Sequence, residues 1–213
     1  MKILFQGDSI TDGAREKTCW FFNYGCGYPC VIGAQLSKEN PGKMEIINRG
    51  VGGNRISDLY ARMKVDCWNF NPDIISILVG VNDVWHKWIC NDNGVDAEKY
   101  FDVYDMLIKH TLSELPNVKI VIMEPFVLKS TATAENYEEF RKEVEQRAQM
   151  AKKIAEKYSL LFVPLQEDFD NALEKAPAEY WLADGVHPAL AGSQLIADKW
   201  TSLVKEQGWL DIK

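Results

Sequence analysis

The sequence has no long apolar run and nothing that resembles a secretion signal at its N-terminus. Lys2 is followed by only three apolar residues before Gln6, Gly7 and Asp8. No stretch approaches the ~20 apolar residues that a membrane-spanning helix requires. These absences predict a soluble protein that is made in the cytoplasm and does not act at a membrane.

Runs of basic residues are also missing. The chain carries 24 Lys and Arg against 31 Asp and Glu, which gives a formal net charge of −7. Without a stripe of cations the protein cannot follow a phosphate backbone, so we do not expect nucleic acid as a partner. The negative charge also disfavours an acidic polymer as a ligand.

Cysteine is infrequent, and its spacing shows no pairing pattern. The cysteines form an odd set of five without CxxC spacing: Cys19, Cys26, Cys30, Cys67 and Cys90. An odd number argues against a disulfide framework. No histidine lies near the first three to complete the four ligands of a zinc site. We therefore expect reduced thiols, no metal site and no cofactor.

Apolar segments rich in β-forming residues alternate with segments of helical periodicity. These β-type segments are Ile3–Phe5, Met44–Ile47, Ile74–Val79, Val118–Met123 and Leu160–Val163. In residues 100–115 and 137–158, apolar residues recur every three or four positions, as in amphipathic helices. The alternation predicts an α/β fold, a three-layer α/β/α sandwich with a central parallel five-stranded sheet. We expect residues 1–213 to form one domain and residues 85–97 to form a loop.

Small polar residues follow the expected strands. Gly7-Asp8-Ser9 follows the first strand, residues 48–54 follow the second, and Gly80-Val81-Asn82-Asp83 follows the third. A fourth polar piece, Asp184-Gly185-Val186-His187-Pro188, precedes the C-terminal helical segment. Ligands bind outside the carboxyl ends of the strands in open α/β sheets, so these residues are expected to meet at one edge.

Ser9 is a candidate nucleophile. A serine hydroxyl needs an imidazole to take its proton and a carboxylate to orient that imidazole. His187 and Asp184 fit these roles, since a separation of three residues on a tight turn can bring them together. Taken alone, Ser9 also fits an ordinary turn, and His187 also fits a helix start before Pro188. His86 and His110 are weaker candidates for the base.

Acyl transfer also requires hydrogen-bond donors for the oxyanion of the tetrahedral intermediate. The candidates are the backbone N–H of Ser9, the backbone N–H of Gly53 and the side-chain amide of Asn82. Alternatively, residues 50–53 form a flexible loop and Asn82 caps a helix. The four polar pieces together supply every part that such catalysis needs, and this combination favours a hydrolase.

These residues resemble the SGNH hydrolases, also called GDSL esterases and lipases. The four blocks of that family are matched in order by Gly7-Asp8-Ser9, Asn48-x-Gly50-x-x-Gly53, Gly80-x-Asn82-Asp83 and Asp184-x-x-His187. The resemblance implies a flavodoxin-like three-layer fold and ester hydrolysis through an acyl-enzyme. The G-x-S-x-G pattern of ordinary α/β-hydrolases is absent, because Thr11 occupies the place of its last glycine.

Within this family the chain is similar to intracellular acetyl-xylan esterases. The similarity is carried by Gly52-Gly53-Asn54, residues 58–62, Pro72-Asp73, residues 80–85 and Pro125-Phe126. It implies the removal of acetyl groups from xylo-oligosaccharides and assembly into a homo-oligomer. The sequence departs from these enzymes in the Cys19–Cys30 region, where the rim of the site and the substrate could differ.

The substrate is expected to carry a short acyl group on a sugar, because no long apolar insertion could cover a fatty acyl tail. Trp85, Trp88 and Trp181 could border the site and stack on pyranose rings, although each indole could equally pack in the core. Asp8 is counted with these substrate-binding candidates, although hydrogen bonds that fix the turn are its expected main role. A lysophospholipase or thioesterase on the same scaffold is the alternative enzyme. A flavodoxin-like module that binds a phosphate without catalysis is the alternative from another class.

Overall fold

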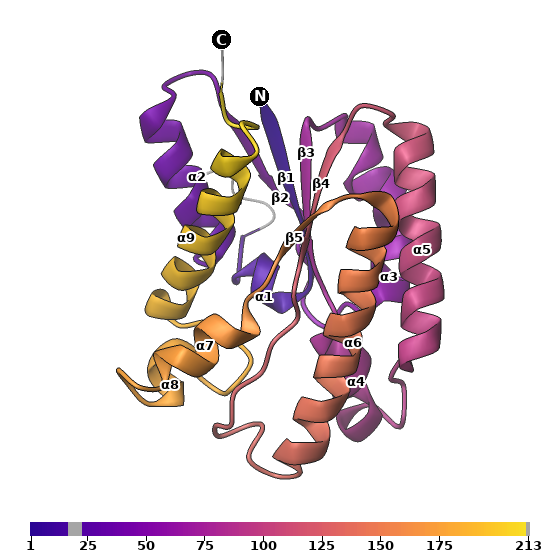
Figure 1. Cartoon of the computed structure of the whole chain (residues 1–213), viewed down its shortest axis with the longest axis vertical. Coiled ribbons are helices and arrows are strands. Elements are labelled where there is room, and N and C mark those ends of the chain that lie inside the picture. The colour runs from indigo at the N-terminus through magenta and orange to yellow at the C-terminus, as the bar shows by residue number, and fades with distance from the viewer. Residues whose placement is uncertain (17–22, 212–213) are drawn as a thin grey trace.

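The computed structural model describes residues 1–16 and 23–211, and its centre is a sheet of parallel strands in the order β2-β1-β3-β4-β5 (Figure 1). The strands are β1 (Lys2–Gly7), β2 (Glu45–Asn48), β3 (Ile74–Leu78), β4 (Lys119–Met123) and β5 (Leu161–Val163). All four pairings are parallel. The predicted α/β sandwich with a five-stranded parallel sheet is confirmed. Cys19 lies outside the described residues.

Helices cover both faces of the sheet (Figure 1). On one face lie α2 (Tyr28–Glu39) and α9 (Leu190–Glu206), and on the other lie α3 (Ile56–Asp66), α5 (Ala97–Glu114) and α6 (Tyr137–Tyr158). Every residue of β3 is buried, as a central strand covered on both faces requires. The Trp200 side chain of α9 is fully buried, and its Nε1 donates a hydrogen bond to Ser76 Oγ of β3 at 3.0 Å.

The shorter helices follow the strands at the carboxyl edge of the sheet, at the lower end of the molecule in Figure 1. They are α1 (Ser9–Asp12), α4 (Val81–Ile89), α7 (Gln166–Ala172) and α8 (Ala178–Trp181). At the opposite edge, the 3-10 helix η1 (Trp68–Phe70) precedes β3. The segments after β1, β2 and β3 therefore share one edge, which is the place where the sequence puts its polar blocks.

The expectation of a loop over residues 85–97 is wrong for its first part. Trp85 to Ile89 belong to α4, because Val81, Val84, Trp85 and Trp88 are spaced as one face of a helix. The turn begins at Cys90, and Asn91 and Asp92 have φ values of 49° and 57°, in the left-handed region. The turn formers Asn91, Asp92, Asn93 and Gly94 directly after α4 give the whole segment the composition of a loop.

No helix among the described residues is long and apolar enough to cross a membrane. Residues 1–16 and 23–211 likewise contain no cluster of three or more His, Cys, Asp or Glu side chains with the geometry of a metal site.

Candidate active site

Ser9 is placed at the start of α1, where β1 ends. Asp8 caps this short helix, and its Oδ1 accepts a hydrogen bond from the backbone N–H of Ile10 at 2.9 Å. The chain thus leaves a buried strand through Gly7 and turns at once, so that Ser9 lies at the carboxyl edge of the sheet, half-buried. Asp8 itself is fully buried. This burial gives Asp8 the turn-fixing role and leaves its side chain no surface for contact with a substrate.

Asp184 and His187 are held by a loop that closes on itself between α8 and α9. An isolated bridge pairs Leu182 with Pro188, and the backbone N–H of Ala183 donates to His187 O at 2.8 Å. The segment after β4 braces this loop, because Ala132 N donates to Asp184 O at 3.0 Å. The loop is therefore fixed before any ligand binds.

The structure brings the three predicted residues into one chain of hydrogen bonds. Ser9 Oγ lies 2.8 Å from His187 Nε2, and His187 Nδ1 lies 2.7 Å from Asp184 Oδ2. The other carboxylate oxygen of Asp184 accepts from the backbone N–H of His187 at 2.8 Å and from that of Val186 at 2.9 Å. Both oxygens of Asp184 are thus in use, and the imidazole is held with Nε2 toward the serine.

The charges of this chain suit a base and its orienting acid. Hydrogen bonding to Asp184 raises the pKa of His187 above its ordinary 6.5, although burial acts in the opposite direction. Burial opposes the charge on Asp184, but the hydrogen bonds from His187 and Val186 outweigh it and lower the pKa of Asp184 to about 2. Asp184 is therefore ionised at neutral pH and stabilises an imidazolium.

The other two histidines lie elsewhere. His110 is on α5, and its Nδ1 lies 2.9 Å from the hydroxyl of Tyr60. His86 is on α4, where burial and the nearby Arg55 lower its pKa. The partner of the Ser9 hydroxyl is His187.

The loop after β2 is docked against α1. Asn48 Nδ2 donates to Thr11 O at 2.7 Å, and Asn48 Oδ1 accepts from Gly50 N at 2.9 Å. A Cβ at Gly50 would lie 2.3 Å from Asp12 N, so only glycine permits this approach. The loop therefore lies against the helix that carries Ser9.

The expected oxyanion donors Gly53 and Asn82 lie on two different segments, the loop after β2 and the first turn of α4. A Cβ at Gly52 would lie 3.8 Å from the Cβ of Ser9, so the glycine loop runs beside Ser9. Gly53 has φ +79°, and no atom lies within 4 Å of a Cβ placed there, so its backbone borders open space. Asn82 is buried on the first turn of α4, and its Nδ2 donates to Asn54 O at 3.2 Å. That contact fixes the amide and uses one of its two hydrogens.

A second buried carboxylate lies near the site. Asp83 is fully buried at the start of α4 and accepts from the backbone N–H of Ile56, the first residue of α3, at 3.1 Å. Burial raises the pKa of Asp83 to about 7, and it raises the pKa of Asp8 to about 7 as well. The charge of Asp8 and that of His187 also interact.

One of the predicted tryptophans, Trp85, lies beside the imidazole of His187, and Trp88 follows it on α4. The ring centroid of Trp85 lies 6.1 Å from that of His187 and 6.0 Å from that of Phe140 on α6. Trp88, one turn further along α4, lies edge-on to Phe140 at 5.3 Å and is 40% exposed. Trp85 and Trp88 therefore both pack against Phe140, with Trp85 next to His187 and Trp88 partly exposed to solvent.

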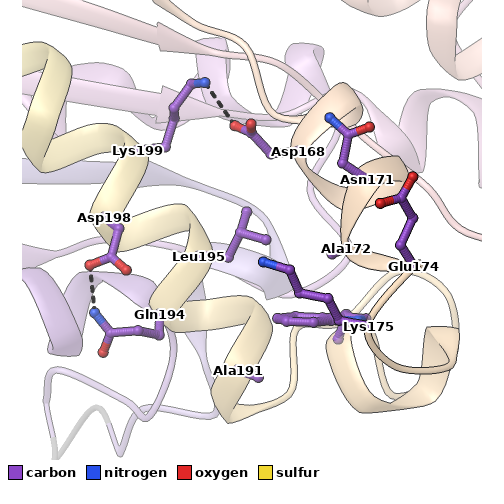
Figure 2. A pocket seen from close by; sticks show the side chains of 11 residues that line it. Asp168, Asn171, Ala172, Glu174, Lys175, Ala191, Gln194, Leu195, Asp198 and Lys199 are labelled. Atoms are coloured by element: carbon purple, nitrogen blue, oxygen red, sulfur yellow. Dashed lines mark hydrogen bonds and ion pairs between the residues drawn. The ribbon is translucent and has the colours of Figure 1, made fainter.

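A cavity lies between α7, α8 and α9 (Figure 2). Trp181 is one of the residues that line it. The cavity has a volume of about 720 Å³ and mixed apolar and polar walls, with Leu195 facing it and an ion pair of Lys199 with Asp168 at 2.9 Å. The residues that line it do not include Ser9, Asp184 or His187. A backbone hydrogen bond connects the wall of the cavity with the loop that holds His187. The N–H of Ala189, two residues after His187, donates to Trp181 O at 2.9 Å.

Sequence reasoning missed two arginines, Arg15 and Arg62, which donate hydrogen bonds to backbone carbonyls of the segments around Ser9. Arg15 donates to Gly50 O through Nε at 3.2 Å and through Nη2 at 3.0 Å. Arg62 of α3 donates to Gly7 O at the end of β1 and to Arg49 O, directly after β2. No local pattern marks these residues, because their partners are 35 and up to 55 positions away.

Comparison with known proteins identifies a family of ester hydrolases. Residues 5–195 match the model of the GDSL-like lipase/acylhydrolase family, and this range contains all the residues of the hydrogen-bonded chain. An acetylxylan esterase from Geobacillus stearothermophilus is 33% identical over 204 residues, which is 92% of this chain and 90% of that protein.

Two solved structures are close in fold and in sequence. A candidate GDSL-like lipase from Parabacteroides merdae is 38% identical, with a TM-score of 0.88 over 96% of this chain and 95% of that chain. Axe2, an acetylxylan esterase from Geobacillus stearothermophilus, is 28% identical, with a TM-score of 0.82 over 100% of this chain and 94% of that chain.

Proposed function

The chain belongs to the GDSL-like lipase/acylhydrolase family and is a carboxylic ester hydrolase, and we propose that it removes acetyl groups from carbohydrates such as xylo-oligosaccharides. Ser9, His187 and Asp184 carry the reaction in this proposal. The observation that supports it most is the unbroken chain of hydrogen bonds from Ser9 Oγ through His187 to Asp184. A phosphate-binding module would need no such chain, and membership of a hydrolase family sets that alternative aside.

The first half of the reaction forms an acyl-enzyme. Ser9 Oγ attacks the ester carbonyl carbon while its proton passes to the neutral Nε2 of His187. Asp184, ionised and bonded to Nδ1, stabilises the imidazolium that results. When the tetrahedral intermediate collapses, the bond from carbon to the sugar oxygen breaks, and His187 returns its proton to that oxygen.

The second half releases the acid. A water molecule gives a proton to His187 and adds to the acyl carbon, and the bond to Ser9 Oγ then breaks. The proton returns to Ser9, so the enzyme ends as it began and the products are the free sugar hydroxyl and acetate. Each tetrahedral intermediate carries a negative oxygen, and we assign its hydrogen bonds to Ser9 N–H, Gly53 N–H and the Asn82 amide.

The preference for an acetylated sugar is supported by the surroundings of Ser9. Trp85 stands beside His187 and Trp88 is partly open, so indole faces are available for pyranose rings. Trp181 adds an indole to the wall of the α7–α8–α9 cavity, which could hold further sugar units of the same substrate. An acetylxylan esterase among the relatives is consistent with this choice.

The test compares acyl chain lengths and measures acetate release. We expect kcat/KM to fall from aryl acetate to octanoate to palmitate, and acetate to be released from acetylated xylo-oligosaccharides. Trp85→Ala and Trp181→Ala should raise KM for the oligosaccharide more than for the aryl acetate. Trp68→Ala is the control, since η1 lies at the opposite edge of the sheet. Faster cleavage of octanoate or palmitate, with no acetate from the sugar, would assign the enzyme to the lysophospholipases or thioesterases.

We further propose that the enzyme acts as a homo-oligomer in the cytoplasm. The resemblance to intracellular acetyl-xylan esterases supports both points, and Cys26, Cys30, Cys67 and Cys90 are free thiols in the structure. Light scattering of the purified protein should give a mass above the 24.3 kDa of one chain. A monomer at assay concentrations would contradict the oligomer.

A further inference from the structure

We propose that Arg62 is a positioning residue of this site, which holds the loop of residues 49–54, and with it the Gly53 N–H, in place beside Ser9. The inference rests on the proposed function, in which Ser9 attacks the ester and Gly53 and Asn82 bind the oxyanion. It does not depend on the identity of the sugar.

One guanidinium reaches three parts of the site. Arg62 Nη2 donates to Gly7 O at 3.0 Å, at the end of β1 and two residues before Ser9. Its Nη1 donates to Arg49 O at 2.8 Å, and its Nε donates to Asn54 Oδ1 at 2.6 Å. Arg62 therefore ties both ends of the 49–54 loop to the end of β1, the strand that leads into Ser9.

This loop needs support from outside itself. Gly52 and Gly53 are exposed, have no side chains to pack, and place Gly53 at φ +79°. Glycine loses more conformational freedom on folding than any other residue, so such a segment is flexible unless its ends are fixed. An oxyanion donor stabilises the transition state only when it is held in position beforehand.

The same contacts extend to the third donor. Asn54, whose side chain is bound by Arg62, accepts a hydrogen bond through its backbone carbonyl from Asn82 Nδ2 at 3.2 Å. Movement of Asn54 would therefore move the Asn82 amide together with Gly53. Arg62 acts on both donors without contact with the substrate.

Arg62 is itself well fixed. Its side chain is 17% exposed, and Nη1 pairs at 3.1 Å with Asp66 Oδ2 on the next turn of α3. Asp66 also pairs with Arg49, and its carbonyl accepts from Gln6 Nε2 of β1 at 2.8 Å. A lysine could not replace these contacts, because an ammonium group cannot present N–H groups in a rigid plane to acceptors on three segments.

The experiment measures three quantities for Arg62→Lys and Arg62→Gln with p-nitrophenyl acetate. We expect kcat to fall by about tenfold or more, as for other small displacements of a catalytic geometry. KM and the acid limb of the pH profile should stay unchanged, because substrate binding and His187 are untouched. The inhibition constant of phenylboronic acid, whose serine adduct places an oxygen in the oxyanion position, should rise in parallel with the fall in kcat.

Arg141→Gln is the matched control. The Arg141 side chain is 19% exposed and pairs with Asp170 and Glu145, and neither partner lies on a loop with an oxyanion donor. Its thermal stability should fall, but kcat and the boronate constant should not change. Asn54→Ala removes one of the Arg62 contacts, so its effect should be non-additive with that of Arg62→Lys. This variant also tests the proposal if Arg62→Gln does not fold.

Three results would overturn the inference. These are an unchanged kcat, a rise in KM alone, or a loss of kcat that Arg141→Gln reproduces at equal loss of thermal stability. The failure of the proposed site looks different, because Ser9→Ala would then keep the wild-type rate. An inactive Ser9→Ala together with fully active Arg62 variants would remove the role of Arg62 only.

Discussion

His187 is the residue whose protonation state controls the proposed reaction. It must be neutral to take the proton of Ser9, so activity falls as the pH drops through its pKa. Because the hydrogen bond to Asp184 raises that pKa above 6.5, the midpoint of the acid limb of kcat/KM should lie above pH 6.5. Asp184→Asn should move the midpoint down and lower kcat by about a thousandfold or more.

The control for this pH dependence comes from the other histidines. His86→Gln and His110→Gln should leave the acid limb in place, since neither imidazole contacts the serine. If His86→Gln or His110→Gln abolished the limb while His187→Ala did not, another residue would be the base.

Asn82 is expected to act on the transition state. Its amide meets a charge that exists only after the carbonyl has been attacked, and its position is fixed by Asn54 O. Asn82→Ala should therefore lower kcat by about a hundredfold or more with little change in KM. Steady-state kinetics with an aryl acetate measure both constants. An effect on KM alone would make Asn82 a substrate-binding residue.

At the residue scale, the sequence predicts that Ser9, Asp184 and His187 lie together, because each proposed role needs a particular residue type next to a strand end or within a short turn. The structure joins the three side chains by hydrogen bonds. The sequence does not predict a role for Arg62, since the proposed positioning role of this side chain depends on acceptors that only the fold brings together. Nor could the sequence alone show that Asp8 is buried and not available to a substrate.

At the scale of elements, the start of α4 is joined to the start of α3 through Asp83 and Ile56 N. Burial raises the pKa of Asp83 to about 7, whereas an unfolded aspartate has a pKa of about 3.9. The folded state therefore holds this proton more tightly. The contribution of Asp83 to the free energy of unfolding is therefore fully present below about pH 4 and is lost as the pH rises through about 7.

Asp83→Asn should remove this pH dependence, because an amide oxygen can still accept from Ile56 N but does not ionise. The thermal midpoint of the wild type should fall relative to that of the variant as the pH rises from 5 to 8. Asp102→Asn, an exposed substitution on α5, is the control and should leave the curve unchanged. Parallel curves for the wild type and Asp83→Asn would contradict the assigned pKa.

The strands could be predicted because buried parallel strands need continuous apolar segments, and their observed bounds differ from the expected ones by no more than a few residues. The long helices α5 and α6 were equally visible from their spacing. Helix α4 was missed because it is short and is followed by a cluster of turn formers. Helix α4 also carries Asn82, Trp85 and Trp88. The wrong loop prediction therefore affects the two tryptophans that are candidates for substrate binding.

At the scale of the whole molecule, the formal charge of −7 affects which acetylated polymers can approach. A neutral substrate meets no repulsion, whereas a polyanion does. Acetylated xylo-oligosaccharides should therefore be hydrolysed faster than acetylated polygalacturonate at low salt. The difference between the two hydrolysis rates should decrease as added salt screens the charges. A faster rate on the polyanion at low salt would contradict this expectation.

The proposed reaction requires Ser9 to be the nucleophile, and covalent labelling identifies the nucleophilic residue. The protein is treated with a serine-directed phosphonate, and the modified residue is located by mass spectrometry of its peptides. We predict one label per chain, on Ser9, and no label on the folded Ser9→Ala variant, which should also have lost turnover. A label on any other residue, or wild-type turnover by Ser9→Ala, would show that Ser9 is not the nucleophile.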